Sequence, residues 1–581
     1  MQVPEKFTFD KVTQIYQELR DERSEWEADA RTISDWLLPG RGIFQTYTKP
    51  RKRKLTTPNV INTIGEDSLY VMTSGIHGRL SSPGMPWFRY AWPSEQLNQM
   101  EMLKQWLQQA EKIVIAGLQA SNFYAMINSF YVEYGGYGTA SIYVGEDTYD
   151  DQVPVRYELM TFGEYAVSMG ANGLPEVYCR TIFMSPRQMV GHFGEKAVSE
   201  EVQRQVKNNE SGADKVNLAV LEFVAAYPHQ DKEYIRIFYE VTGTGNTGRG
   251  SQNRSNFKLG EEPLQVDGFY EFPYVVGRWS TIGSDTYGIG PGSRSIPDIK
   301  RLQEMEKAFL MATHKNINPP LNAPANMKGK LNTLPGGKNY YSNPAATVNE
   351  VYQVNFDYVG VSQAIERVEQ RIQRNFFNDV FITGNRDPNA SPLRTGQVNA
   401  MQQEQMFRLG PVTERLHSEV FTPALRRTFK IMHRKGMFPP LQPEYEELIS
   451  QLEVNLVSPM AVAQNKARSQ GVDALIAFTA QVAQFNPAVV DNIDIDAAAR
   501  NRGDIEGVEL GILRTQDDVD EIRDQRAKAQ QAQQQKEEQA AQAQLGSQVQ
   551  NTDAGTMKTQ AEAGQILAET QQTNTEAGTL Q

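Results

Sequence analysis

Apolar side chains recur at steps of three and four residues along two stretches in the middle of the chain. Each stretch, 295–317 and 361–382, carries one apolar stripe among charged residues. This spacing is typical of a helix with a single apolar face. We therefore expect two amphipathic helices of about twenty residues, each about 30 Å long. Their stripes contain Leu302, Met305, Phe309, Ile365, Val368, Ile372 and Phe376.

The segment between the two helices, 318–360, is expected to form a small folded knob. Its prolines forbid a continuous helix, because proline lacks an amide hydrogen and clashes with the preceding turn. Apolar and polar residues alternate from Tyr352 to Tyr358, which predicts a short strand. The stripes of the flanking helices can be buried in a monomeric hairpin or against neighbouring subunits, and the pattern alone does not choose between these.

Before the helix pair, the hydrophobic pattern changes from helical to strand-like. Helical spacing covers 12–38 and returns over 96–118. From 139 to 241 the period becomes two, with Asn172-Gly173 marking a tight hairpin and Ser185-Pro186 the start of a short helix. We expect an α+β domain with an antiparallel sheet here.

After the helix pair, the pattern predicts a polar loop, more helices and a tail. The loop covers 383–396, and helix is expected over 397–435 with a break at Gly410-Pro411, and again over 469–513. Thr515 to Asp518 offers a capping box for a last helix. Beyond Arg526 the chain is rich in glutamine and alanine and cannot bury a core. We expect this tail to be disordered, or to form helices that pack only with copies of themselves, and we prefer disorder.

The composition is that of a folded protein with several domains, since 39% of 581 residues are hydrophobic. A formal net charge of -12 argues against a protein that grips nucleic acid through its bulk surface. The single cysteine, Cys179, excludes an internal disulfide and fits a reducing cytoplasm. No signal peptide and no apolar run of about 18 residues is visible, so no membrane partner is expected.

One local basic run stands out against the acidic balance. It lies between Lys49 and Lys54 and is a candidate for contact with phosphates, although such runs are commonly solvated loops. The candidate residues are Arg51, Lys52, Arg53 and Lys54.

Motifs for catalysis are missing or poorly placed. The string from Gly243 to Gly248 fits G-x-G-x-x-G, but no helical periodicity follows it, as a dinucleotide site requires. No phosphate-cradling P-loop occurs, and the six histidines lack the spacing of metal ligands. Acidic pairs such as Asp517-Asp518 lie near helix starts, where carboxylates meet the helix dipole. We expect no catalytic residue, no cofactor and no metal site.

Short motifs follow one another along the chain in a recognisable order. The central ones are Phe272-Pro273, Arg278-Trp279, Tyr287-Gly-Ile-Gly-Pro291, Asp298, Leu302 and Pro319-Pro320. Others are Arg23, Trp26, Leu38-Pro39, Leu80-Ser-Ser-Pro83, Trp87-Phe88, Leu409-Gly-Pro-Val412, Leu416, Pro423 and the stretch from Gly507 to Arg526. Together they resemble the podovirus head-to-tail connecting protein family, the portal proteins of short-tailed phages. One departure is Thr395-Gly396-Gln397-Val398, where the family often carries Thr-Ala-Thr-Glu-Val.

The resemblance implies a phage portal fold of the α+β class. Its parts would be an α/β wing (1–294), a two-helix stem (295–317 and 361–382), a small α/β clip (318–360), a channel loop (383–396), wing helices (397–438), a helical crown (439–526) and the tail (527–581). The stem stripes would then be buried mainly between subunits and serve oligomerisation.

The function implied is that of a non-enzymatic portal ring, usually of twelve subunits, at one capsid vertex, through which DNA is packaged and ejected and to which the tail attaches. Implied partners are sister subunits, double-stranded DNA, the terminase motor, tail adaptor proteins, capsid protein and internal head proteins. The protein would be made in the cytoplasm of the bacterial host and reside in the virion. An oligomeric tail adaptor or filament protein without a DNA channel is the alternative, and a nucleotide-dependent enzyme is a third, weakened by the missing phosphate loop.

Two groups of candidate site residues follow from these assignments. In the channel loop, Asn385, Arg386, Asp387 and Arg394 could make brief phosphate contacts or bond only to their neighbours. At the protruding clip, the candidates for partner contact are Lys328, Lys330, Lys338, Tyr340 and Tyr341.

Overall fold

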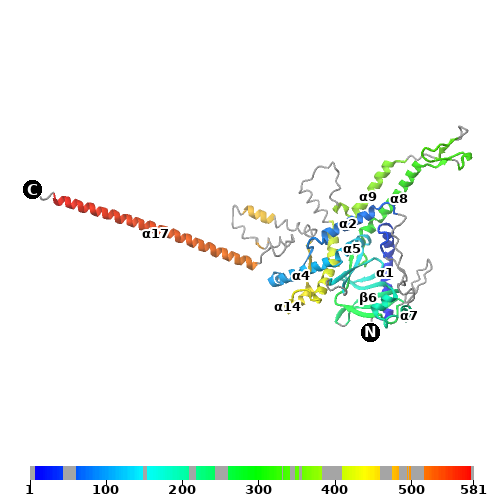
Figure 1. Ribbon diagram of the computed structural model, residues 1–581, viewed down its shortest axis with the longest axis horizontal. Helices are drawn as coiled ribbons and strands as arrows, with labels where there is room; N and C mark the ends of the chain where they lie inside the picture. The colour runs from blue at the N-terminus through cyan, green and yellow to red at the C-terminus, as the bar shows by residue number, and fades with distance from the viewer. Residues whose placement is uncertain are drawn as a thin grey trace. The chain divides into compact units, whose positions relative to one another are not determined.

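A computed structural model of the chain (Figure 1) divides it into two compact units, Met1–Ile493 and Asp494–Gln581. The structure describes residues 7–42, 60–147, 153–208, 218–229, 231–241, 259–329, 331–340, 347–351, 356–381, 408–457, 474–482, 494, 496, 498 and 516–576. The first unit combines helices with antiparallel sheets, which confirms the expected mixed fold class.

Five helices lie within the described residues from 7 to 138. Those expected over 12–38 and 96–118 are confirmed as α1 (Phe9–Trp36) and as α3 (Glu95–Gln99) with α4 (Glu101–Ala120). The pattern did not predict α2 (Ile64–Leu80) or α5 (Phe123–Tyr137). Most side chains of α5 are buried, so it has no polar face to give a helical period.

Two antiparallel sheets follow. The larger has the order β4-β5-β6-β7-β8 and the smaller the order β3-β2-β9. Their strands are β2 (Thr139–Glu146), β3 (Val155–Met160), β4 (Tyr165–Met169), β5 (Pro175–Met184), β6 (Leu218–His229), β7 (Lys232–Glu240), β8 (Gln265–Phe269) and β9 (Tyr274–Arg278). The antiparallel sheet expected between 139 and 241 is thereby confirmed.

Both local signals in this region are confirmed. Gly173 adopts φ +74° between β4 and β5, and the Asn172 side chain accepts a hydrogen bond from the amide of Leu174. Ser185 forms a capping box with Gln188 at the start of α6 (Pro186–Phe193). A second short helix, α7 (Glu200–Lys207), packs beside it.

The two long central helices are confirmed as α8 (Pro291–Ile317) and α9 (Tyr358–Asn375), which pack against each other and are called the helix pair below. Between them β10 (Leu321–Asn322) pairs with β11 (Asn349–Glu350), and η3 (Ala325–Met327) is a single 3-10 turn. The strand expected from Tyr352 to Tyr358 is wrong at its end, because Tyr358 opens α9 and the Asp357 side chain caps it; residues 352–355 lie outside the described residues.

The helix expected over 397–435 is composite. Its described part contains α12 (Gly410–Arg415), a π-helical segment η4 (Leu416–Phe421) and α13 (Thr422–Arg434). The predicted break coincides with the start of α12, but the π-helical segment was not predicted. Then follow α14 (Pro443–Glu446), the 3-10 segment η5 (Glu447–Gln451) and β12 (Glu453–Leu456), which pairs with β1 (Phe88–Ala91). Residues 474–482 are helical, as expected within 469–513.

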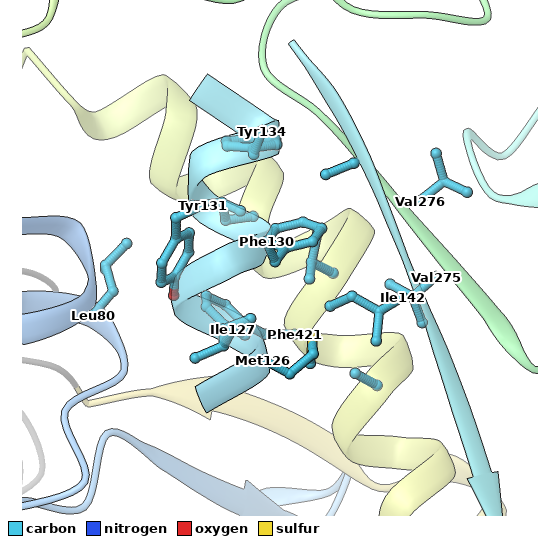
Figure 2. Close-up of a cluster of buried hydrophobic side chains, with 14 of the residues drawn as sticks. Leu80, Met126, Ile127, Phe130, Tyr131, Tyr134, Ile142, Val275, Val276 and Phe421 are labelled. Atoms are coloured by element: carbon cyan, nitrogen blue, oxygen red, sulfur yellow. The ribbon is translucent and has the colours of Figure 1, made fainter. Parts of the chain in front are cut away.

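The main core of the first unit surrounds α5. Figure 2 shows aromatic and aliphatic side chains of α5 between residues of α2, β2, β9 and η4. These neighbours come from segments far apart in the sequence. The core of the first unit therefore joins α2, near the start of the chain, to η4. The labelled residues are Leu80, Met126, Ile127, Phe130, Tyr131, Tyr134, Ile142, Val275, Val276 and Phe421.

Among its described residues, the second unit contains one long helix, α17 (Gln516–Glu576). Disorder, the preferred interpretation of the tail, is therefore wrong over 527–576. Alanine, glutamine and glutamate are strong helix formers, and this local preference prevails although each described side chain beyond Arg523 is exposed. Thr515, the expected cap, lies outside the described residues.

Candidate functional site

The helix pair is buried at its base by its own chain. Leu302 and Ile372 are 0% exposed, and α8 and α9 contact α2, while α1 and α5 also pack on α8. The interpretation that the stripe residues are buried mainly between subunits is therefore wrong for Leu302, Ile365, Val368, Ile372 and Phe376. Helices from the first 140 residues supply their apolar partners. The hydrophobic pattern does not say which helices pack against each other.

Met305 and Phe309, the other two stripe residues, are only partly buried. Phe309 packs against the rings of Phe356 and Tyr358, with centroids 6.0 Å away in both cases. The apolar contact between the two helices thus continues through this aromatic group toward the knob. Beyond it, the pair loses the support of α2 and α5.

Glycines lock the start of α8 onto the end of α5. Gly138 ends α5 with φ +83°, and a Cβ at Gly288 or Gly290 would lie 2.6–2.7 Å from a carbonyl oxygen of Gly138 or Gly135. Two residues further along, a Cβ at Gly292 would clash with the carbonyl oxygen of Gly136. The glycines of the Tyr287-Gly-Ile-Gly-Pro291 motif thus allow close contact between the backbones of α5 and the start of α8. This contact fixes the base of the helix pair.

Replacing Gly292 with alanine should therefore destabilise the chain by about 3 kcal/mol or more, because neither backbone can yield without shifting a whole helix. Denaturant unfolding measures the change. Gly191→Ala on α6 is the matched control, because an added Cβ meets nothing within 4 Å there, and it should leave stability equal or slightly higher. Similar losses in both variants would contradict the backbone-contact argument.

Hydrogen bonds join the helix pair to the residues just before α2. The Gln303 side chain accepts hydrogen bonds from the amides of Ile61 and Asn62, at 2.6 and 2.9 Å. The Asn62 side-chain amide donates to Glu306 of α8 and Glu369 of α9, at 3.0 and 2.8 Å. One asparagine therefore bridges the two helices and sets their spacing at this level.

The far half of the helix pair leaves apolar side chains uncovered. Leu310 is 42% exposed and Ile317, seven residues later and hence on the same side of α8, is 76% exposed. Met311 and, on α9, Val359 are exposed as well. Sequence reasoning missed these residues because the pattern shows which face of a helix is apolar. It does not show how much of that face other helices bury. A subunit surface at this level is the simplest way to remove them from water.

The described parts of the knob form no core of their own. Within 318–351 none of their residues is classed as buried, and their regular structure is one two-residue strand pair and the 3-10 turn η3. Lys328, Lys338 and Tyr340 are exposed, and their contact with a partner stays a prediction. Lys330 and Tyr341 lie outside the described residues.

The expected channel loop, 383–396, lies outside the described residues, which stop at 381 and resume at 408. Phe377, after α9, has φ 56°, a left-handed conformation that is uncommon for a bulky residue, and the short helix α10 (Asn378–Phe381) follows. Asp379 forms an ion pair of 2.6 Å with Arg408, so the chain leaves and returns at one place. Asn385, Arg386, Asp387 and Arg394 lie outside the described residues, as do Arg51, Lys52, Arg53 and Lys54, and their roles remain predictions.

A buried ion pair connects β9, the strand that precedes α8, to the π-helical segment η4. Arg278, at the end of β9, donates to the Glu419 carboxylate of η4 through Nη2 at 2.8 Å and through its amide at 2.9 Å. The Nε of Arg278 also donates to this carboxylate at 3.3 Å, while Nη1 donates to the carbonyl oxygen of Asp285 and Nη2 to that of Gly173. Arg278 belongs to the Arg-Trp motif, to which sequence reasoning assigned no role.

The described residues show neither a metal-binding cluster nor a membrane-spanning helix. No group of three or more histidine, cysteine or acidic side chains among them could hold a metal ion. None of the helices in the described ranges is long and apolar enough to cross a membrane. The candidate dinucleotide string, 243–248, lies outside these ranges.

Comparison with known proteins gives consistent matches. The family model for "Bacteriophage head to tail connecting protein" matches residues 10–513. The chain is 30% identical over 546 residues to the "Probable portal protein" of Bordetella phage BPP-1, covering 92% of this chain and 94% of that one. It is 28% identical over 527 residues to the "Portal protein" of Salmonella phage epsilon15, covering 89% and 91%.

Two solved assemblies also contain similar chains. One is the neck of an empty gene transfer agent (GTA) particle, with TM-score 0.35 and 12% identity over 72% of this chain and 86% of that chain. The other is the virion of a native GTA particle, with TM-score 0.32 and 10% identity over 70% and 95%.

Proposed function

This chain belongs to the bacteriophage head-to-tail connecting protein family, and we propose that it forms the portal ring at one capsid vertex, the conduit for genome packaging and ejection and the attachment point of the tail. The observation that carries the proposal is the helix pair, whose base is held by the chain's own core while its far half leaves apolar residues uncovered. Repeated around a ring, such rods enclose a pore.

The parts of the ring follow the order of the chain. Residues 1–294 and 397–438 form the wing, α8 and α9 the stem, 318–360 the clip, 383–396 the channel loop and 439–526 the crown. Twelve subunits make the ring. The clip contacts the terminase motor during packaging and tail adaptors afterwards, while capsid protein and internal head proteins surround the wing and crown.

The acidic balance suits a conduit for duplex DNA. A net charge of -12 per chain, repeated around a ring, repels phosphates within the Debye length of about 8 Å and lets the duplex slide. Arg386 and Arg394 supply local, brief contacts. The chain itself carries out no catalysis, and the energy for transport comes from the motor.

The alternative, an adaptor or filament protein without a channel, is not favoured, because both relatives are named as portal proteins and are matched over nearly their whole length. Infection with a phage that lacks this gene tests the function. Heads should accumulate without DNA and without tails, and the wild-type gene supplied in trans should restore both. DNA-filled heads in the absence of the protein would refute the proposal.

A further inference from the structure

Helix α5 carries one carboxyl group among the apolar residues of the main core. Glu133 is 1% exposed, and its Oε2 accepts a hydrogen bond from the amide of Phe162 at 3.1 Å. The ion pairs among the described residues do not include it. A carboxylate that leaves water without a paired cation is costly, whereas the neutral acid is much less so. Glu133 therefore differs from Glu419, whose carboxylate is paired with Arg278.

The partner amide lies in the turn between β3 and β4, which we call the 161–164 turn. Within it, the amide of Thr161 donates to the Glu164 carboxylate, and the amide of Glu164 donates to the carbonyl oxygen of Thr161, both at 3.1 Å. The ring of Phe162 stacks on the ring of Tyr137 from α5, with centroids 5.6 Å apart. This ring contact and the hydrogen bond to the buried carboxyl group hold the turn on the helix.

The 161–164 turn also supports the base of the helix pair. The ring of Phe162 meets the ring of Tyr287 edge-on, with centroids 5.7 Å apart. Tyr287 opens the glycine motif that leads into α8, and Tyr137 directly precedes Gly138, where α5 ends. A displacement of the turn therefore removes a contact from both sides of the backbone contact between α5 and α8.

The surroundings of Glu133 place its titration near neutral pH. Burial raises its pKa, the amide of the turn and the guanidinium of Arg41 offset part of this, and the nearby Glu164 raises the pKa further. The result is a pKa of about 7, against an ordinary value of 4.5. Arg41 also faces Glu66 of α2, and the phenol of Tyr165 faces Glu133 from β4. The carboxyl group is therefore neutral in mildly acidic solution and ionised in mildly alkaline solution.

We propose that Glu133 makes the contact between α5 and the 161–164 turn sensitive to pH. While the carboxyl group is neutral, the turn stays packed on the helix. Once ionised, the carboxylate draws in water, and the turn is the neighbour that yields, because α5 is buried on nearly all sides whereas Thr161 and Glu164 are partly exposed. The support of Tyr287 loosens in the same step. The inference concerns the single chain and does not depend on the proposed portal function.

The stability of the chain should depend on pH with a definite sign. The pKa of Glu133 is higher in the folded chain than its ordinary value, so the folded state binds this proton more tightly than the unfolded state. The resulting stabilisation is fully present below about pH 4.5 and is lost as the pH rises through about 7. Glu111 on α4, whose pKa burial also raises to about 7, adds the same trend. A measurement on the turn itself is needed to separate the two.

Hydrogen exchange of the full-length chain, read by mass spectrometry and corrected for the intrinsic effect of pH on exchange, measures the turn directly. From about pH 5.5 to about pH 8, the protection of the peptide that contains the 161–164 turn should fall about 10-fold or more in the wild type. In Glu133→Gln, whose amide imitates the neutral acid, the protection should stay constant. Glu111→Gln is the matched control, and its turn should lose protection as the wild-type turn does.

Three results would overturn the inference: equal protection of the wild-type turn at both pH values, the same loss in Glu133→Gln as in the wild type, or no loss in Glu111→Gln. The last would make the opening of the turn a consequence of general destabilisation. A Glu133→Gln chain that fails to fold would also contradict the inference, because a site that holds the neutral acid must accept a neutral side chain of the same shape.

Discussion

Replacing both Leu310 and Ile317 with aspartate should leave a folded chain that no longer assembles into rings. Leu310 is 42% exposed and Ile317 76% exposed in the single chain, so its unfolding midpoint should change little. At a subunit interface each buries apolar area that contributes about 1.5–3 kcal/mol, and a buried, unpaired carboxylate costs more. The association at each contact should therefore weaken more than about 100-fold. Analytical ultracentrifugation at matched concentrations measures the loss.

The matched control is Ile282→Asp, the same change at a side chain that is 68% exposed but lies outside the helix pair. It should form rings as the wild type does. Loss of rings in both variants would mean that added charge, and not its position on α8, disrupts assembly. Rings of normal stability from the Leu310 and Ile317 variant would show that the far half of the pair is not a subunit contact.

Glu419→Ala should destabilise the chain by about 3–5 kcal/mol, because it leaves the Arg278 guanidinium buried without its carboxylate. The pair joins β9 to η4, so the loss should also loosen the strand that leads into α8. Chemical denaturation with global fitting gives the free energy of unfolding. We expect a single transition at a lower midpoint.

Glu195→Ala provides the comparison, since the Glu195–Lys207 pair has the same 2.8 Å separation but is exposed on both sides. Removing this exposed pair should change the unfolding midpoint far less than the loss of Glu419, because solvent screens its charges. If both substitutions cost the same, burial is not what makes the Arg278–Glu419 pair important.

The existence of the helix pair could be predicted from sequence, but its partners could not. The steps between Leu302, Met305 and Phe309 report a helix with one apolar face. They do not report that α2 and α5, more than 150 residues earlier, cover that face at its base. The uncovered residues, Leu310 and Ile317, become visible only once the position of that cover is known.

The other failures have separate causes. Helix α5 was missed because it is buried on nearly all sides, and η4 because a π-helical segment has no pattern of its own. Disorder was preferred for the tail because it cannot form a core, but its residues have a high helix propensity and form α17. Conversely, Leu334-Pro-Gly-Gly337 carries the residues of a type II turn, so this turn could have been predicted from the sequence.

A cryo-EM reconstruction of the purified full-length protein tests the central claim most directly. The account predicts a closed ring with a hole that admits duplex DNA, in which Leu310 and Ile317 contact a neighbouring subunit while Leu302 and Ile372 contact only their own chain. A monomer at high concentration, or a ring in which the far halves of α8 and α9 face solvent on all sides, would contradict it.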